Sequence, residues 1–317
     1  MLHNHILRRN LLKAGLVGAL MISIGSVSTF AAASPEQNAP ALKTIEPGYL
    51  TVAILGELPA SGIDNNRITG TDGEIISLIA DKLGLKVKPV LASNAGVIEA
   101  VRSGRADVML GNMRWTAKRA DVIALSNPAY FISYGVITQK DRELPPLINI
   151  SDLSGKRTGT LTGASSTAEL KKIPNVAAVN FYDNSEAAIR DLTSGRLDFA
   201  VLDPTLIAFQ AKRNPALNLK HVVFKPDADF AYLTGRSQVV FGVSYDNPDL
   251  LDAINAGLKW VGATGQSKKI FSKYGLDDPD YFKPLDVDNR IGVDRDANGA
   301  VIGKGAHATK DFSRYFE

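Results

Sequence analysis

The sequence contains no cysteine and only four histidines. Without cysteine the chain can form neither disulfides nor thiolate metal sites, so its stability must come from a buried core. Two of the histidines, His3 and His5, lie at the amino end, which leaves His221 and His307 for the rest of the chain. No nucleophile–base pairing and no metal-ligand spacing stands out, so neither a cofactor nor a metal is expected.

The amino end has the order of an export signal. Arg8, Arg9 and Lys13 precede an uncharged stretch over residues 14–35, in which Ala31–Ala33 supplies a small-residue exit. Cleavage is therefore expected after Ala33. The paired arginines resemble a twin-arginine signal, and an ordinary secretory signal or a retained membrane anchor are the alternatives.

Once this signal is removed, the remaining chain has no excess of positive or negative charge. Residues 1–33 hold three cations and no acids, so their loss takes the formal net charge from +3 to zero. A neutral chain has no broad cationic field, which disfavours nucleic acid and anionic lipid as partners. The remaining length exceeds what one compact core usually organises and favours two domains or lobes.

Apolar strand-like runs alternate with amphipathic helical runs, which predicts an α/β fold with mainly parallel sheets. In the first half, the pattern predicts strands at Leu50–Leu55, Val87–Leu91 and Asp107–Leu110, and helices at Glu74–Leu83 and Asn94–Ser103. We expect Gly84 to end the first helix in a left-handed turn and the Asn94 side chain to cap the second.

The second half repeats the pattern of the first. Val101–Asp107, which ends a helix at a glycine and begins a strand, is echoed by Leu192–Asp198. Polar residues follow both strands, Gly111-Asn112 in one copy and Asp203-Pro204 in the other. Ligands bind beyond the carboxyl ends of parallel strands, so the sequence predicts two similar lobes with a cleft between them.

The chain is expected to cross between the lobes twice. Tyr134–Gln139 leads out of the first half and Gln238–Ser244 leads back, followed by helices capped at Asn247 and spanning Gln266–Tyr274. The predicted segments are the signal at 1–33, the first lobe at 34–136 and 236–282, the second lobe at 137–235, and a C-terminal extension of unknown role at 283–317.

Arg119 is the clearest candidate for ligand binding. It lies in a strand-to-helix connection, where a guanidinium can hold a small carboxylate by two parallel hydrogen bonds. Asp203 occupies the matching position of the second half. One fixed cation and one fixed anion facing each other suit a zwitterion.

Four motifs, in order within residues 43–282, resemble those of the family 3 extracellular solute-binding proteins, the amino-acid receptors of ABC importers. They are Asn112–Arg119, Ser126–Tyr130, Gly155–Ser166 and Gly195–Asp203. The resemblance implies the type II periplasmic binding protein fold, in which each of two lobes has a mixed, mainly parallel sheet flanked by helices and the ligand cleft lies between them.

The resemblance also implies roles for individual residues. Arg119 would clamp the α-carboxylate of an amino acid, assisted by Ser165 and by backbone donors near Gly111 and Ala164, while Asp203 would take the α-amino group. The expected ligand contacts are Gly111, Asn112, Arg114, Arg119, Ala164, Ser165, Ser166 and Asp203.

The function implied by the resemblance is that of a monomeric periplasmic binding protein. It would capture an amino acid or a close derivative by hinge closure and deliver it to an ABC permease in the inner membrane. The alternatives are an enzyme of the same fold, similar to cyclohexadienyl dehydratase, with Glu74 as its carboxylate, and a ligand-sensing partner of a membrane receptor.

Two departures from the family pattern leave the ligand's side chain open. Arg114 stands where the family often has serine: pointing inward it would favour a second acidic group on the ligand, and the outward or structural alternative is preferred. The helix opening at Gly73-Glu74-Ile75 lacks the family's Phe-Asp, and the loop Leu58–Ser61 lacks an aromatic residue that often covers the side chain.

Other candidates have simpler interpretations. Trp115 and Tyr130 are expected to pack in the core or the hinge, not to stack on a ligand. The carboxylates of Glu57 and Asp64 are expected to be solvated in their loops, although both could line the cleft mouth. Asp294–Gly299 resembles the start of a calcium loop, but a hairpin turn at Ala297–Ala300 explains it better.

Overall fold

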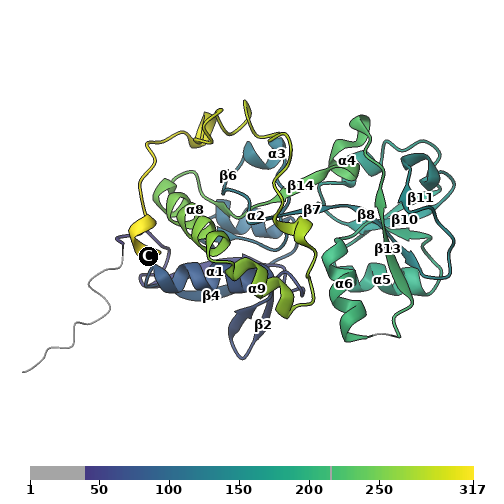
Figure 1. The fold of residues 1–317 in the computed structure, drawn as a ribbon, viewed down its shortest axis with the longest axis horizontal. Coiled ribbons are helices and arrows are strands. Elements are labelled where there is room, and N and C mark those ends of the chain that lie inside the picture. Colours follow the sequence, from purple (N-terminus) through teal and green to yellow (C-terminus); the bar gives the residue numbers. More distant parts are fainter. Residues whose placement is uncertain (1–39, 215) are drawn as a thin grey trace, which may run out of the picture. The chain divides into compact units, whose positions relative to one another are not determined.

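A computed structural model describes residues 40–214 and 216–317. The proposed export signal and its cleavage point at Ala33 lie outside the described residues. Within the described part of the chain, no helix is both long and apolar enough to cross a membrane. Figure 1 shows two groups of strands and helices with two extended segments running between them.

The first lobe is built on a mixed sheet with the strand order β4-β1-β5-β15-β6. Its strands are β1 (Tyr49–Ile54), β4 (Lys86–Leu91), β5 (Val108–Met109), β6 (Ala124–Leu125) and β15 (Gly242–Val243), with a separate hairpin of β2 (Gly62–Asp64) and β3 (Arg67–Thr69). Its helices are α1 (Thr71–Lys82), α2 (Gly96–Arg102), α3 (Ala117–Ala120), α8 (Pro248–Ala263) and α9 (Gln266–Lys273).

The second lobe contains a sheet with the order β11-β10-β12-β8-β13-β9. Its strands are β8 (Gly135–Gln139), β9 (Leu147–Ile148), β10 (Arg157–Leu161), β11 (Ala178–Tyr182), β12 (Phe199–Ala200) and β13 (Leu219–Phe224). Its helices are α4 (Thr167–Leu170), α5 (Ser185–Thr193), α6 (Pro204–Arg213) and α7 (Ala231–Thr234), with short 3₁₀ turns at Ile150–Leu153 and Ala228–Phe230.

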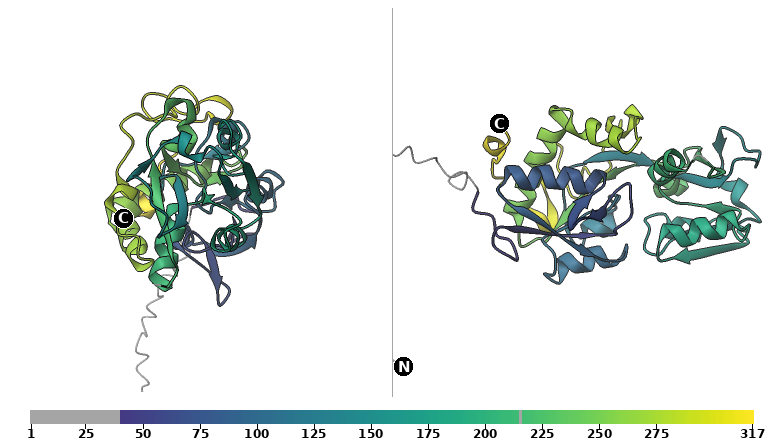
Figure 2. Two further views of the ribbon diagram at one scale, coloured as in Figure 1. Left: turned by 90° about the vertical axis from the view of Figure 1, so that its right-hand side faces the viewer. Right: turned by 90° about the horizontal axis from the view of Figure 1, so that it is seen from below.

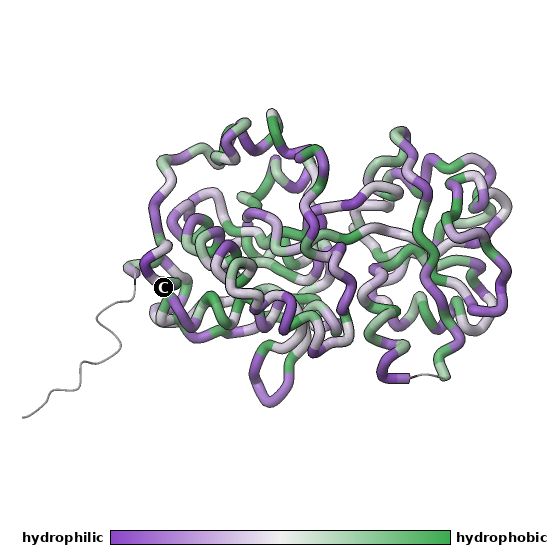
Figure 3. The backbone as a smooth tube through the Cα atoms, viewed as in Figure 1, coloured by the Kyte–Doolittle hydropathy of each residue, from purple (hydrophilic) through white to green (hydrophobic). Residues whose placement is uncertain are grey.

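The central strands of both sheets are buried on both faces, which explains why they are apolar runs without alternation. In β1, Val52 belongs to one core cluster and Ala53 to the cluster on the opposite face. In the second lobe, Phe199 and Ala200 divide in the same way. Figure 3 shows hydrophobic stretches gathered inside each lobe and polar stretches in the outer loops.

The internal repeat seen in the sequence corresponds to a repeated structure. Gly104 and Gly195 both follow a helix end with left-handed φ values of 70° and 73°. The next aspartate in each copy reaches the neighbouring parallel strand of its own sheet: Asp107 accepts the N–H of Thr51 at 2.8 Å, and Asp198 accepts the N–H of Arg157 at 2.9 Å. The carboxylates therefore fix the short strands β5 and β12 against β1 and β10.

The two lobes are joined by the antiparallel pair β7 (Tyr130–Ser133) and β14 (Arg236–Val239). The right-hand view of Figure 2, compared with the labels of Figure 1, shows the connection between the two lobes. The returning segment, predicted as one strand over Gln238–Ser244, is two strands, because β14 pairs with β7 whereas β15 pairs with β5 and β6.

Several predicted boundaries need correction. The first helix begins at Thr71, not at Glu74, and so includes Asp72; Gly84 follows it with φ 71°, as predicted. The side chains of Asn94 and Asn247 do not cap the helices that follow them. Their amides instead donate to the carbonyls of Thr162 and Lys43, at 3.1 and 2.8 Å, because distant chain segments offer better-placed acceptors.

The hairpin turn near the C-terminus is confirmed. The N–H of Asp296 donates to the carbonyl of Ala300 at 2.9 Å, and its carboxylate accepts the N–H groups of Asn298 and Ala300. The carboxylate of Asp296, which would be a ligand in a calcium loop, thus closes the turn instead. In residues 40–214 and 216–317, no group of three or more acidic or histidine side chains is placed to hold a metal.

Candidate functional site

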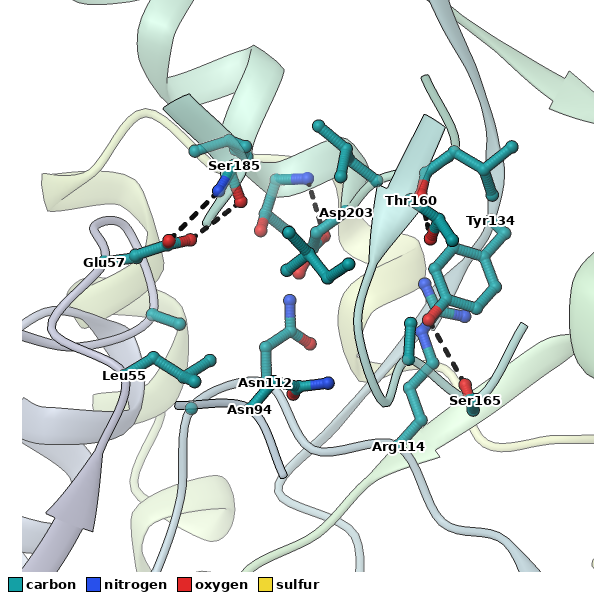
Figure 4. Close-up of a pocket in the computed structure, with 18 of the residues that line it drawn as sticks. Leu55, Glu57, Asn94, Asn112, Arg114, Tyr134, Thr160, Ser165, Ser185 and Asp203 are labelled. Carbon is teal, nitrogen blue, oxygen red and sulfur yellow. Dashed lines mark hydrogen bonds between the residues drawn. The ribbon is translucent and has the colours of Figure 1, made fainter. Parts of the chain in front are cut away.

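A cavity of about 80 Å³ lies between the loops that follow the strands of the two sheets. Figure 4 shows Glu57 and Ser185 at one end and Arg114, Tyr134 and Ser165 at the other. The lining residues are Leu55, Glu57, Leu58, Pro59, Ala60, Asn94, Gly111, Asn112, Arg114, Arg119, Tyr134, Thr160, Leu161, Ala164, Ser165, Ser185, Val201, Leu202, Asp203, Thr205 and Leu206.

Asp203 supplies the anionic group of the cavity. It is the N-cap of α6, where its Oδ1 accepts the N–H of Thr205 at 2.9 Å and Pro204 occupies the first helical position. Its Oδ2 is buried and has no hydrogen-bond partner in the protein. Burial raises the pKa of Asp203, although the nearby cation of Arg114 lowers it. A buried acceptor without a partner is costly, so this oxygen is suited to receive a donor from a ligand.

Arg119 supplies a cation from helix α3, which begins after the Thr116 cap. The guanidinium is buried, and its desolvation lowers the pKa. Nη1 donates to the carbonyl of Arg114 at 2.5 Å, and Nη2 donates to the carbonyl of Gly163, in the second lobe, at 3.2 Å. These two acceptors use two of the five N–H groups of the guanidinium, which lies at the wall of the cavity.

Arg114 does not point outward. Its side chain is 3% exposed, and its Cζ lies 3.3 Å from the ring centroid of Tyr134. Nη2 donates to the carbonyl of Ser133 at 3.1 Å, in the crossing strand β7. The two alternatives for Arg114 are therefore not exclusive, because it packs against the interlobe strand and also lines the cavity.

The expected backbone donors are engaged elsewhere. The N–H groups of Gly111 and Asn112 donate to Asp72 Oδ2 at 3.0 and 2.6 Å, and the N–H of Ala164 donates to the carbonyl of Leu161 at 3.1 Å. These residues line the cavity, but their N–H groups are not free for a carboxylate. Both Gly111 and Asn112 have positive φ values, 117° and 58°, so the loop turns sharply toward Asp72 after β5.

The two serines differ. Ser165 lines the cavity, with its hydroxyl 3.2 Å from the hydroxyl of Tyr134. Ser166, the residue before α4, is fully buried and is not among the residues that line the cavity.

Asp72 was missed because the predicted helix began two residues after it. Its carboxylate is fully buried and also accepts the hydroxyl of Tyr130, in the crossing strand β7, at 2.7 Å. Burial raises the pKa of Asp72 to about 6, despite the hydrogen bonds from Asn112, Tyr130 and Gly111 that lower it. Asp72 thus joins the loop behind the cavity to the strand that connects the lobes.

Contacts between the lobes surround the cavity. Glu57, expected to be solvated, accepts the N–H and the hydroxyl of Ser185, at the start of α5, at 3.1 and 2.7 Å. Asn94 donates to the carbonyl of Thr162, next to the acceptor of Arg119. The described structure therefore holds the two lobes in contact around the site.

The remaining candidates lie outside the cavity. Trp115 and Tyr130 are 4% and 1% exposed and pack in the core, which confirms the packing interpretation. Asp64 is exposed on β2. Glu74, the carboxylate considered for an enzyme, accepts the ammonium of Lys273 and the hydroxyl of Tyr274 at 2.7 and 2.5 Å on the surface of the first lobe.

Comparisons with known proteins agree with this architecture. Residues 50–277 match the model of the bacterial extracellular solute-binding proteins, family 3. The chain belongs to this family. A similar solved structure is an ancestral arginine-binding protein bound to glutamine, with a TM-score of 0.63 and 28% identity, covering 73% of this chain and 99% of that one. The two-lobe type II fold expected from the motifs is thereby confirmed.

Two curated relatives of this solute-binding protein are similar over different lengths. The L-arginine-binding protein of Pseudomonas aeruginosa is 26% identical over 279 residues, 83% of this chain and 96% of that protein. The probable ABC transporter extracellular-binding protein YckB of Bacillus subtilis is 30% identical over 180 residues, 54% of this chain, and the match spans 61% of YckB.

Proposed function

We propose that this solute-binding protein captures an amino acid or a close derivative in the periplasm and delivers it to an ABC permease, with residues 137–235 as the lobe that closes over the ligand. The observation that carries the proposal is the buried, unpartnered Oδ2 of Asp203 in the same cavity as the guanidinium of Arg119. An ammonium and a carboxylate on one small molecule complement these two groups.

The energetics favour such a ligand. In a closed, water-poor cavity each charge-assisted hydrogen bond is stronger than in water, whereas an unpaired charge is costly. A ligand that touches both lobes binds the closed state better and shifts the population toward it. The names of the relatives, with arginine and glutamine as bound molecules, support the amino-acid class.

The binding role is proposed in preference to an enzymatic one. Glu74, which would have to transfer a proton, lies outside the cavity and is engaged by Lys273 and Tyr274. A thermal-shift screen of amino acids, opines and dicarboxylates tests the ligand class, because binding to the folded state alone raises the melting temperature. Turnover of arogenate or prephenate by the purified protein would contradict the proposal.

A further inference from the structure

The family model ends at residue 277, but the chain continues to Glu317. We call residues 278–317 the C-terminal strap. Figure 1 shows the strap crossing the first lobe, with its end beside α1 and α8. Phe312 and Phe316 belong to the core cluster of that lobe, and Phe316 packs on Trp260 of α8 with ring centroids 5.7 Å apart.

The strap carries a buried ionic cluster. Arg290 is 1% exposed and donates from Nε and Nη2 to the carboxylate of Asp294, at 3.0 and 2.7 Å. Arg295 is 3% exposed and donates to the same carboxylate at 3.3 Å. Buried charges need partners, so two arginines with one aspartate require further acceptors close by.

Those acceptors belong to residues 114–126, the segment that carries Arg114 and Arg119. β6 is the edge strand of the first sheet, and the carbonyl of Leu125, at its end, accepts from Arg290 and Arg295 at 3.1 and 2.5 Å. The carbonyl of Ser126 accepts from Arg290 at 2.6 Å. The strap therefore satisfies exposed edge groups that would otherwise have no partner.

The same cluster contacts the other end of this segment. Asp294 Oδ2 accepts the indole N–H of Trp115 at 3.2 Å. Trp115 directly follows Arg114 and precedes helix α3, which contains Arg119. One strap carboxylate, with its two arginine partners, thus fixes residues 115 and 125–126, on either side of α3.

The strap also contacts a strand that joins the lobes. Gln238 of β14 donates to Asp288 Oδ1 at 2.6 Å, and its carbonyl accepts the N–H of Trp115 at 2.8 Å. Arg236, at the start of β14, donates to the carbonyls of Asp280 and Lys283 at 2.5 and 2.8 Å.

From these contacts we infer that the C-terminal strap is a positioning element of the ligand site. Through Asp294 and Asp288 it holds the segment that carries Arg114 and Arg119 against strand β14, so that the two guanidinium groups keep their places when the lobes move. The inference rests on the proposed amino-acid binding, because it assigns the strap a role in that same site.

Two mild variants of the full-length protein test it. Breaking a buried ion pair is strongly destabilising, so an Asp294 variant would not separate positioning from folding. Trp115→Phe removes the indole donor together with part of a ring that packs in the core. Asp288→Ala removes an exposed carboxylate that accepts from the amide of Gln238 and from the N–H of Arg290. Each should weaken the binding of L-arginine or L-glutamine, whichever the wild type binds more tightly, by about two- to tenfold in calorimetry.

Hydrogen exchange gives a readout that does not depend on ligand. In both variants, amides of residues 119–126 should exchange faster, whereas those of β10 and β11 in the second lobe should not change. Phe316→Ala is the matched control, because it loosens the strap from α8 and lowers stability without touching Trp115 or β14. It should leave the affinity of the folded protein unchanged.

The outcomes are distinguishable. Unchanged affinity and unchanged exchange at residues 119–126 in both variants would overturn the inference, as would a loss of affinity in Phe316→Ala as large as that in Trp115→Phe. If the wild type binds neither amino acid, the proposed function loses that support, and the exchange data alone still decide whether the strap holds the segment.

Discussion

The substitution Asp203→Asn gives a direct measure of how the cavity recognises an amino group. The wild-type carboxylate divides its two oxygens between two tasks: Oδ1 caps α6 through the N–H of Thr205, and Oδ2 is buried without a protein partner. Asparagine has the same shape and can keep the cap with its oxygen. It then presents an NH₂ group in place of Oδ2, and two donors face each other when an ammonium enters.

The expected loss follows from this exchange of acceptor for donor. Removing one partner of a buried, hydrogen-bonded charge pair costs about 2–5 kcal/mol, so affinity should fall by about 30-fold to several thousand-fold. Without ligand the effect on stability has the opposite sign. Burial raises the pKa of Asp203 above its unfolded value, so the folded protein loses stability when this carboxyl group ionises as the pH rises. Asparagine does not ionise, so the variant should be at least as stable as the wild type.

The assay compares an amino acid with its 2-hydroxy analogue, by calorimetry at neutral pH. The wild type should prefer the amino acid, and Asp203→Asn should lose most of that preference while its affinity for the hydroxy acid changes less. Asp191→Asn is the matched control, because Asp191 lies in the same lobe and pairs with Arg196 away from the cavity. Equal losses for the two molecules would refute the role of Asp203 in binding an amino group.

Three further substitutions probe the cation, the buried carboxylate and the interlobe contact. Arg119→Ala should weaken amino-acid binding by about 2–5 kcal/mol in calorimetry, with little loss of thermal stability, and unchanged affinity would remove Arg119 from the site. The pKa of Asp72 is raised from 3.8 to about 6, so its contribution to stability is full below pH 3.8 and is lost as the pH rises through 6. Over this range, the unfolding free energy of the wild type in urea titrations should fall relative to that of Asp72→Asn by roughly 3 kcal/mol. A difference that stays constant with pH would contradict the raised pKa. Glu57→Gln should weaken the contact with Ser185 and reduce ligand affinity by about tenfold. Without ligand, it should also increase the distance between spin labels placed on the two lobes. An unchanged distance would show that the contact does not hold the lobes together.

Much of the fold could be predicted because its signals are local. The helix ends that precede Gly104 and Gly195 are marked by the same short pattern in the sequence, and both glycines adopt the left-handed turn that the pattern requires. The strands β1 and β12 could be predicted from the sequence because they are buried on both faces and are therefore continuous apolar runs. Arg119 and Asp203 follow such strands, so their presence in one cavity could be expected from the carboxyl-end rule.

The errors occurred where a side chain has its partner far along the chain. Asparagine often caps helices, but the side-chain amide of Asn94 donates to a carbonyl 68 residues away. Glu57 has the position of a solvated loop acid, but its carboxylate binds Ser185, 128 residues away. Asp72 was hidden by a boundary error of three residues, because Gly70 allowed the helix to begin earlier than its apolar stripe suggested.

By itself, the sequence determined the α/β class, the repeated half and the two charged residues proposed to bind the ligand, since each depends on periodicity or on a short motif. The tertiary structure alone decided that Arg114 both packs on Tyr134 and lines the cavity. It also decided that a charged C-terminal segment is buried: Arg290 is tolerated inside because the carbonyls of Leu125 and Ser126 and the carboxylate of Asp294 surround it. Desolvation of a charge is repaid only by partners that folding brings together, and no local pattern shows where those partners are.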